Sequence, residues 1–384
     1  MKFIVAPDSF KGSMSSGCII EIIKKAAYKV FPDCEMIGVP IADGGEGTLD
    51  AIVSYVHGEY QPVTVKNTLG VDIQAKYGIL NQESAIIEMA VASGLTLISE
   101  ELRNPLNTTT YGTGQLIKHA LDKGYRKINI AIGGSGTNDG GIGAMAALGV
   151  RFLDKDGCEV EPVGRSLIRI ADIDLSNLHP ELAKADITVM CDVNNPLLGP
   201  AGATYVYGPQ KGGDSVILDQ LEQGMENYSN VIKKIFHVDI AGQKGAGAAG
   251  GLGGALMFFT GARLQSGIST LLKLIKFDEL LKETDLVITG EGRMDEQSAY
   301  GKVASGIGLL CKENGVPVVA IVGGMGKGAD TIYDYGIDSM ISAVNAPMSL
   351  DYAMEHAEDL LQDAAERLFR LIRVGMVMKT NNRT

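Results

Sequence analysis

The stretch LVITGEGRMDEQSAYGKVASGIGLLCKENGVPVVAIVG (286–323) decides the fold. It begins and ends with short apolar runs, LVITG (286–290) and VPVVAIVG (316–323), which are typical of strands buried on both faces of a sheet. Between them we expect a helix over about 298–314, because Gly315 stops the helical pattern. A strand, a helix and a second strand in this order predict a parallel βαβ unit.

The same alternation continues on both sides of this unit. KFIVA (2–6), EMIGVPI (35–41) and DSMISAV (338–344) are three further apolar runs that predict strands. Together with the two strands of the central unit, they predict a five-stranded, doubly wound parallel sheet in an α/β domain. Helices are expected over about 13–30, 46–57, 329–335 and 350–373.

The middle of the chain loses this rhythm. We therefore expect a discontinuous domain made of residues 1–60 and 283–384, with a second α/β domain, 61–282, inserted into it. Within the insertion we expect an antiparallel group, followed by helices and strands in alternation. The expected ranges are 63–65, 74–80 and 85–89 for the group, 108–123 and 142–148 for helices, and 127–132 and 187–191 for strands.

Composition excludes several classes of protein. The net charge is −12 and no basic block occurs, which disfavours binding to nucleic acids or to anionic membranes. The five cysteines are scattered, and we expect reduced thiols in a cytoplasmic protein. Glycine is the unusual entry in the composition, with 49 of 384 residues, and these glycines lie among apolar runs rather than in a linker.

Charged residues and glycines gather after the predicted strands. Ligands of parallel α/β sheets bind beyond the carboxyl ends of the strands, so these loops predict an active site, placed here in a cleft between the two domains. The loops are PDSFKGS (7–13), ADGGEGT (42–48), GGSGTNDGG (133–141), DVNNP (192–196), GEGRMD (290–295) and GGMGKG (323–328).

Two patterns have alternative interpretations. Asp43 and Glu46 could hold Mg²⁺ together with water and phosphate oxygens, or they could form the cap and acidic first turn of a helix. GAGAAG (245–250) matches G-x-G-x-x-G, but no clear strand precedes it, so a glycine loop for packing or for a phosphate is favoured over a dinucleotide site. The residues alone indicate an α/β enzyme that handles an anion or phosphate, assisted by Mg²⁺.

Six segments, taken together and in this order, carry a likeness to a known family: APDSFKGS (6–13), PIADGGEGT (40–48), GGSGTNDGG (133–141), CDVNNPLLGPAGATYVYGPQKG (191–212), GAGAAGGLG (245–253) and ITGEGRMDEQSAYGK (288–302). They resemble the bacterial glycerate kinase family, type I. The likeness runs from about residue 2 to residue 343 and covers nearly the whole chain. It implies a flavodoxin-like domain with an inserted α/β domain, and transfer of phosphate from ATP, with Mg²⁺, to D-glycerate, usually giving 2-phosphoglycerate and ADP.

Three positions depart from the pattern of that family. Gly136 stands where alanine is commoner, and Lys244 and Ala304 stand where proline is often found. They lie beside the acidic positions rather than on them, so they bear on the stiffness of loops more than on chemistry.

A kinase must hold a metal-bound triphosphate, orient the acceptor and stabilise the charge of the transferred group. For the catalytic residues we expect Asp192 as the base, Asp8, which also follows a predicted strand, as a further catalytic acid or base, and Lys11 on the phosphate or the glycerate carboxylate. Asp43 and Glu46 are the expected metal ligands. The alternatives are loop or helix caps for the acids and an ordinary surface position for Lys11.

Glycerate carries a carboxylate, which a planar guanidinium can bind with two hydrogen bonds. Arg293 is the best-placed arginine for this task, with Ser9, Glu291 and Asp295 as further substrate-binding residues. The alternative is that Arg293 only forms structural ion pairs with its acidic neighbours.

The glycine-rich loops are expected either to flank the nucleotide phosphates or to let helices approach closely. The threonines at 108–110 are similarly expected to form an anion site or to cap a helix. The expected nucleotide-binding residues are Gly134, Ser135, Asn138, Asp139, Gly247, Gly250 and Gly251.

Two other functions compete with a kinase. One is a two-domain protein that binds or senses a small anion without chemistry, and the other is a nucleotide-dependent oxidoreductase. The first would not need several carboxylates around a metal, and the second lacks a convincing dinucleotide motif. The expected partners are therefore D-glycerate and a nucleotide, and we expect binding to neither nucleic acid nor membrane. A homodimer is compatible with the sequence, which does not decide the oligomeric state.

Overall fold

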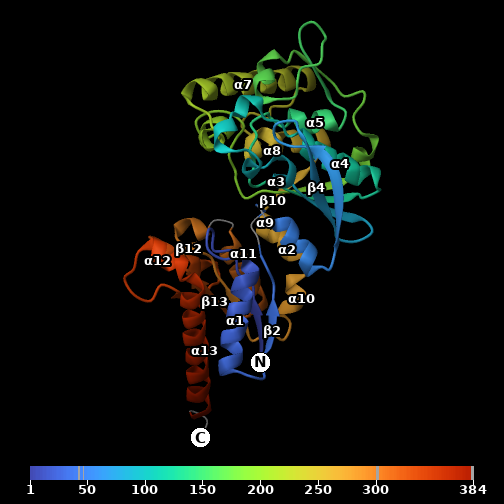
Figure 1. Cartoon of the computed structure of the whole chain (residues 1–384). Coiled ribbons are helices and arrows are strands. Elements are labelled where there is room, and N and C mark those ends of the chain that lie inside the picture. The colour runs from blue at the N-terminus through green and yellow to red at the C-terminus, as the bar shows by residue number, and fades with distance from the viewer. Residues whose placement is uncertain (42–43, 46, 300–301, 382–384) are drawn as a thin grey trace. The chain divides into compact units, whose positions relative to one another are not determined.

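The computed structural model describes residues 1–41, 44–45, 47–299 and 302–381 (Figure 1). Its contacts divide the chain into two compact units. The first unit comprises residues 1–43 and 268–384, and the second comprises residues 44–267.

The first limit between these units, after residue 43, precedes the sequence-based limit after residue 60 because of tertiary packing around α2 (Thr48–Tyr55). Val53 and Leu49 pack against β4 (Asp72–Ile79), where a Cβ on Gly78 would lie 2.3 and 3.0 Å from these two side chains. The contact-based limit therefore precedes α2, although the alternation of strands and helices placed this helix with the first unit.

The first unit is built on a parallel sheet. Its described strands form a five-stranded sheet in the order β15-β13-β11-β1-β2, and every neighbouring pair is parallel. Counted along this unit alone, the order is 2-1-3-4-5, which is the flavodoxin-like arrangement. The predicted doubly wound sheet is thus confirmed. The strands are β1 (Lys2–Val5), β2 (Glu35–Gly38), β11 (Leu286–Thr289), β13 (Val318–Val322) and β15 (Ser339–Ser342).

Helices cover both faces of this sheet. Phe3 and Val5 of β1 belong to the apolar core beneath α1 (Ser16–Val30) and α13 (Ala357–Asn381), which lie side by side (Figure 1). The helix α11 (Val303–Asn314) contacts β11 and β13 without joining that core, and it covers the opposite face. Side chains of a strand alternate between the two faces, so apolar residues throughout the run are buried.

Three predicted helices differ in detail. The expected helix 298–314 begins only at Val303, after a 3₁₀ turn over Glu296–Ala299. The expected helix 329–335 is a 3₁₀ helix, and the long terminal helix is broken at His356 into α12 (Leu350–Glu355) and α13.

The second unit contains a mixed sheet. Its described strands form a six-stranded sheet in the order β10-β9-β6-β5-β4-β3, in which β10 to β5 are parallel and β4 and β3 are antiparallel additions. The predicted antiparallel group is therefore one edge of a larger sheet. The strands not yet given are β3 (Glu59–Lys66), β5 (Ser84–Glu88), β6 (Lys127–Ala131), β9 (Asp186–Met190) and β10 (Arg263–Gln265).

Smaller elements complete both units. Two short strand pairs flank the main sheets: β7 (Arg151–Leu153) with β8 (Asp172–Asp174), and β12 (Arg293–Met294) with β14 (Gly324–Met325). No described helix is both long and apolar enough to span a membrane. The remaining helices are α3 (Ala90–Ser93), α4 (Tyr111–Asp122), α5 (Ile142–Ala147), α6 (Ala203–Tyr207), α7 (Ser215–Phe236), α8 (Leu252–Thr260), α9 (Gly267–Leu274) and α10 (Phe277–Leu281).

Candidate active site

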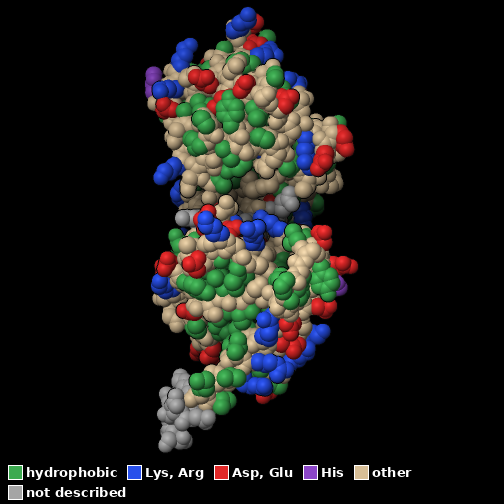
Figure 2. Space-filling view, turned by 90° about the vertical axis from the view of Figure 1, so that its left-hand side faces the viewer, with side chains coloured by type: hydrophobic (Ala, Val, Ile, Leu, Met, Phe, Trp, Pro, Cys, Tyr) green, Lys and Arg blue, Asp and Glu red, His purple; other side chains and the backbone are tan. Residues whose placement is uncertain are grey.

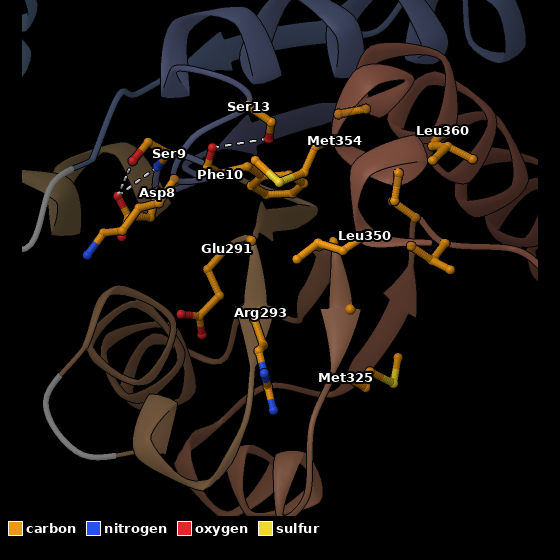
Figure 3. A pocket seen from close by; sticks show the side chains of 18 of the residues that line it. Asp8, Ser9, Phe10, Ser13, Glu291, Arg293, Met325, Leu350, Met354 and Leu360 are labelled. Atoms are coloured by element: carbon orange, nitrogen blue, oxygen red, sulfur yellow. Dashed lines mark hydrogen bonds between the residues drawn. The ribbon is translucent and has the colours of Figure 1, made fainter. Parts of the chain in front are cut away.

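A cavity of about 640 Å³ lies at the carboxyl end of the sheet in the first unit (Figure 3). The loops that follow β1, β11, β13 and β15 line it, and α12 and the start of α13 close one side. The neighbouring strands β1 and β11 are where the strand order reverses, and such switch points are the usual ligand-binding positions of open α/β sheets. The cavity therefore occupies the place where this fold binds ligands.

The loop after β1 brings Asp8, Ser9 and Lys11 to the cavity. The backbone N–H of Asp8 donates to the carbonyl oxygen of Gly290 at 2.9 Å, which ties this loop to the end of β11. The Asp8 carboxylate accepts a hydrogen bond from the backbone N–H of Ser9 at 2.7 Å. Lys11 is exposed, so its ammonium group can reach an anion in the cavity.

The loop after β11 supplies Glu291, Arg293 and Asp295 to the same cavity. The guanidinium Nε of Arg293 lies 3.6 Å from Asp295 Oδ2, and the Arg293 side chain is 74% exposed. An ion pair this open is weak in water, so the guanidinium remains available to a second carboxylate. Arg293 thus has both the structural contact and the accessibility that its two sequence-based interpretations require.

Glu291 is the electrostatically unusual acid of the cavity. Partial burial raises the pKa of its carboxyl group, as do the nearby charges of Asp8 and Asp295, whereas Ser298 and Lys302 act in the opposite direction. Its Oε1 atom is buried without a hydrogen-bond partner, and Figure 3 shows the carboxylate in the cavity, between Asp8 and Arg293. A carboxylate in this state is suited to accept a proton or a hydroxyl hydrogen bond.

The opposite wall of the cavity is apolar, and sequence reasoning missed it. It comprises Phe10, Met325, Leu350, Met354 and Leu360, which Figure 3 shows facing the cavity. Leu350 and Met354 lie four residues apart on α12, a spacing that could have indicated a shared face, whereas Leu360 lies on α13, beyond the break at His356. Lys302, which also lines the cavity, was missed as well, although it lies in one of the resembling segments.

In the second unit, Asp139 joins two helix starts. Its carboxylate accepts hydrogen bonds from the N–H and hydroxyl of Thr110, at 2.7 and 2.8 Å, and from the N–H groups of Gly141 and Gly143, at 3.0 and 3.2 Å. Thr110 precedes α4, and Gly141 precedes α5. The side chain is fully buried, and burial raises its pKa. Asp139 therefore stabilises the starts of α4 and α5 by hydrogen bonding, a role that could not be predicted from its position in a glycine-rich loop.

Lys211 is a buried cation that sequence reasoning did not single out. Its Nζ donates to Ser135 Oγ at 2.9 Å and to the carbonyl oxygen of Thr137 at 2.6 Å. Burial lowers the pKa of Lys211 to about 7, against the opposing effect of the charge of Asp139. Lys211 therefore fastens the loop that contains the expected nucleotide-binding residues.

The other two expected residues of this loop differ in exposure. Gly134 is exposed and has a positive φ of 72°, which favours glycine. Asn138 is fully buried, its Nδ2 donates to Thr204 Oγ1 at 3.4 Å, and its Oδ1 has no partner. Of the two, only Gly134 presents itself to solvent.

The glycine run 245–253 packs against its own chain. A Cβ on Gly247 would lie 2.1 Å from the carbonyl oxygen of Pro196, and one on Gly250 would lie 2.1 Å from that of Thr137. A Cβ on Gly251 would similarly approach the backbone of the 133–141 loop, at 2.6 Å. These contacts support the packing interpretation of the run, because backbone atoms of other segments occupy the positions that a Cβ would need.

Asp192 follows β9 in the second unit, and its Oδ1 accepts a hydrogen bond from the N–H of Gly267 at 3.0 Å. Asp43 and Glu46, the expected metal ligands, lie outside the described residues. Within the described part of the chain, no three acidic, histidine or cysteine side chains come together as a metal-binding group.

The comparisons with known proteins agree across nearly the whole length. Residues 3–373 match the model of the glycerate kinase family. The chain is 44% identical to a glycerate kinase of Halalkalibacterium halodurans, over 95% of this chain and 96% of the relative, and 42% identical to glycerate 2-kinase of Escherichia coli K12, over 98% and 99%. A crystal structure of a protein described as glycerate kinase 2 from Salmonella typhimurium LT2 superposes with a TM-score of 0.86, at 39% identity and 98% and 99% coverage.

Proposed function

The chain belongs to the glycerate kinase family, and we propose that it transfers the γ-phosphoryl group of ATP to D-glycerate. One observation carries this proposal: acids, a hydroxyl and cations from two loops that are far apart in sequence line one cavity at the switch point of the first sheet. Full-length relatives at about 40% identity that are named for this activity support it. Neither a sensor nor an oxidoreductase receives such support.

We propose that glycerate binds through the loop after β11. The exposed guanidinium of Arg293 would hold the carboxylate with two hydrogen bonds. Ser9 and Glu291 would bind the hydroxyl groups, and Asp295 would orient Arg293 from 3.6 Å. Such positioning lowers the barrier because the acceptor oxygen is already aligned when the phosphoryl group arrives.

The acceptor hydroxyl must lose its proton to a carboxylate as the new bond forms. Asp192 and Asp8 remain our proposed residues for this step, each at the carboxyl end of a strand. Lys11 would stabilise negative charge on the transferred group, because this exposed lysine lines the same cavity as Ser9 and Asp8. Separate Asp→Asn variants with unchanged turnover would remove either acid from this role.

We propose Mg²⁺ as the second cofactor. Mg²⁺ in kinase sites takes one or two carboxylates in addition to phosphate oxygens and water, and when bound it neutralises charge on the phosphates. Asp43 and Glu46 remain the proposed ligands, and the unpartnered Oε1 of Glu291 is a carboxylate oxygen of the kind that Mg²⁺ prefers.

One assay tests the reaction and its product together. Purified protein is given D-glycerate, ATP and Mg²⁺, and release of ADP is measured with and without glycerate. The product is then passed to enolase, either directly or after phosphoglycerate mutase. We expect enolase to act directly, which identifies 2-phosphoglycerate; a requirement for the mutase identifies 3-phosphoglycerate, and no glycerate-dependent ADP contradicts the proposal.

A further inference from the structure

The cavity of the first unit has an end that glycerate cannot match. Its volume of about 640 Å³ falls within the roughly 300–1,000 Å³ of sites that take ligands much larger than a three-carbon acid. Glycerate carries a carboxylate and hydroxyl groups, and all of these suit the loops after β1 and β11. The apolar wall (Phe10, Met325, Leu350, Met354 and Leu360) offers none of the polar partners that glycerate needs.

Part of this wall is exposed to water. Leu350 is 73% exposed, Met325 is 49% exposed and Met354 is 39% exposed, although all three line one cavity. Large apolar side chains that share a concave surface mark a place where an apolar ligand binds. Figure 3 shows Leu350 and Met354 on the side of the cavity away from Asp8 and Ser9. The cavity is thus polar at one end and apolar at the other.

We propose that the apolar wall binds the adenine base of ATP, with the phosphates extending toward the polar end. This inference rests on the proposed function, which makes ATP the co-substrate. A purine has two broad apolar faces, and thioether and aromatic groups pack well against such rings. Lys11 and Lys302 also line the cavity and provide positive charge for the phosphates.

Two further observations favour this occupant. The cavity lies at the switch point between β1 and β11, where flavodoxin-like sheets bind nucleotides. In contrast, the glycine run 245–253, the other segment with a nucleotide-binding pattern, is filled by its own chain around Gly247 and Gly250. The base is therefore better accommodated in the first unit than against that run.

The test compares charge placed on the wall with charge placed elsewhere. Leu350→Asp and Met325→Asp put a carboxylate on exposed positions of the wall, so neither change disturbs a packed core. Val216→Asp is the matched control, because Val216 is 65% exposed and lies in the first turn of α7 in the second unit. Thermal unfolding of all three full-length proteins verifies that they fold.

Binding is measured by calorimetry with two probes, ADP and inorganic tripolyphosphate, the second of which lacks a base. We expect both wall variants to bind ADP about tenfold or more weakly than wild type, since they lose apolar contact and place a charge against the base. Tripolyphosphate affinity should change far less, and the glycerate KM should stay within about twofold of the wild-type value. Met325→Leu, which keeps the position apolar, should bind ADP as wild type does, and so should Val216→Asp.

The outcomes separate this inference from the proposed function. Unchanged ADP affinity in both wall variants overturns the inference, as does an equal loss for ADP and tripolyphosphate. A rise in glycerate KM with normal ADP binding also overturns it, because the wall would then serve the acceptor. If wild type binds ADP and the wall variants lose this binding, but the wild-type protein itself does not phosphorylate glycerate, the base site stands while the proposed function fails.

Discussion

The Nζ atom of Lys211 lies 2.6 Å from the carbonyl oxygen of Thr137, in the interior of the second unit. Only 2% of Lys211 is exposed, and Ser135 Oγ is its other hydrogen-bond partner. A buried ammonium group is costly to hold in its charged form, so this contact fixes the glycine-rich loop but makes its stability depend on pH.

Lys211→Met tests that dependence. Burial lowers the folded-state pKa of Lys211 to about 7, whereas an unfolded lysine titrates near 10.4. Between these values the unfolded chain binds the proton more tightly, so wild-type stability should rise with pH relative to the variant, by up to about 1.4 kcal/mol per pH unit. Urea unfolding at several pH values between 7 and 9 measures the difference. Lys155→Met, at an exposed site, is the control; parallel wild-type and Lys211→Met curves contradict the prediction.

Arg293→Lys tests the proposed binding of the glycerate carboxylate. An ammonium group cannot make two parallel hydrogen bonds to a carboxylate, so we expect the glycerate KM to rise about tenfold, with the ATP KM within about twofold of wild type. Steady-state kinetics with each substrate varied in turn give both values. Arg169→Lys, an exposed ion-paired arginine of the second unit, should change neither. An unaltered glycerate KM would contradict carboxylate binding by Arg293 and would favour a purely structural role in its contact with Asp295.

Glu291→Gln should increase stability and decrease activity. Burial raises the folded-state pKa of Glu291, so the folded chain holds this proton more tightly than the unfolded chain, and ionisation lowers stability as pH rises through that range. The stability of the variant relative to wild type should therefore increase as the pH rises from acidic to neutral. In the same variant, kcat/KM for glycerate should fall by about tenfold or more, because a charged hydrogen-bond acceptor is lost. Unfolding curves and kinetics across pH measure the two effects. Glu313→Gln, at an exposed position, is the control. Full activity of Glu291→Gln would exclude a role for the Glu291 carboxylate in the reaction.

Gly250→Ala should destabilise the second unit. Gly250 has a φ of 66°, and its Cβ would lie 2.1 Å from the carbonyl oxygen of Thr137. Backbone strain and overpacking together should cost about 2–5 kcal/mol. Gly242→Ala is the matched control, because a Cβ there would have no neighbour within 4 Å. Denaturant unfolding of both variants measures the cost; a difference below about 0.5 kcal/mol would mean that the loop adapts.

Much of the fold could be predicted because its pattern is local. The apolar runs at 2–6 and 286–290 became β1 and β11, and the loops after them brought Asp8 and Glu291 to one cavity. Parallel strands place their carboxyl ends on one edge, so strand order in the sequence was enough to predict this meeting.

Other features escaped prediction because they depend on contacts between distant segments. The break at His356 that separates α12 from α13 has no strong local marker, and Leu350 and Met354 of the apolar wall lie on α12. Lys211 was not singled out from the sequence, because its hydrogen-bond partners lie on a segment more than seventy residues away.

The sequence by itself determined the family, the βα alternation and the polar loops at the strand ends, since each is written in neighbouring residues. Only the tertiary structure decided what the glycines do: Gly247 and Gly250 approach backbone of their own chain, whereas Gly134 faces solvent. It also decided which carboxylates are buried, as in Asp139, and which remain at a cavity, as in Asp8. The physical reason is that close approach and burial depend on which distant segments fold against a residue, and a local pattern does not record this.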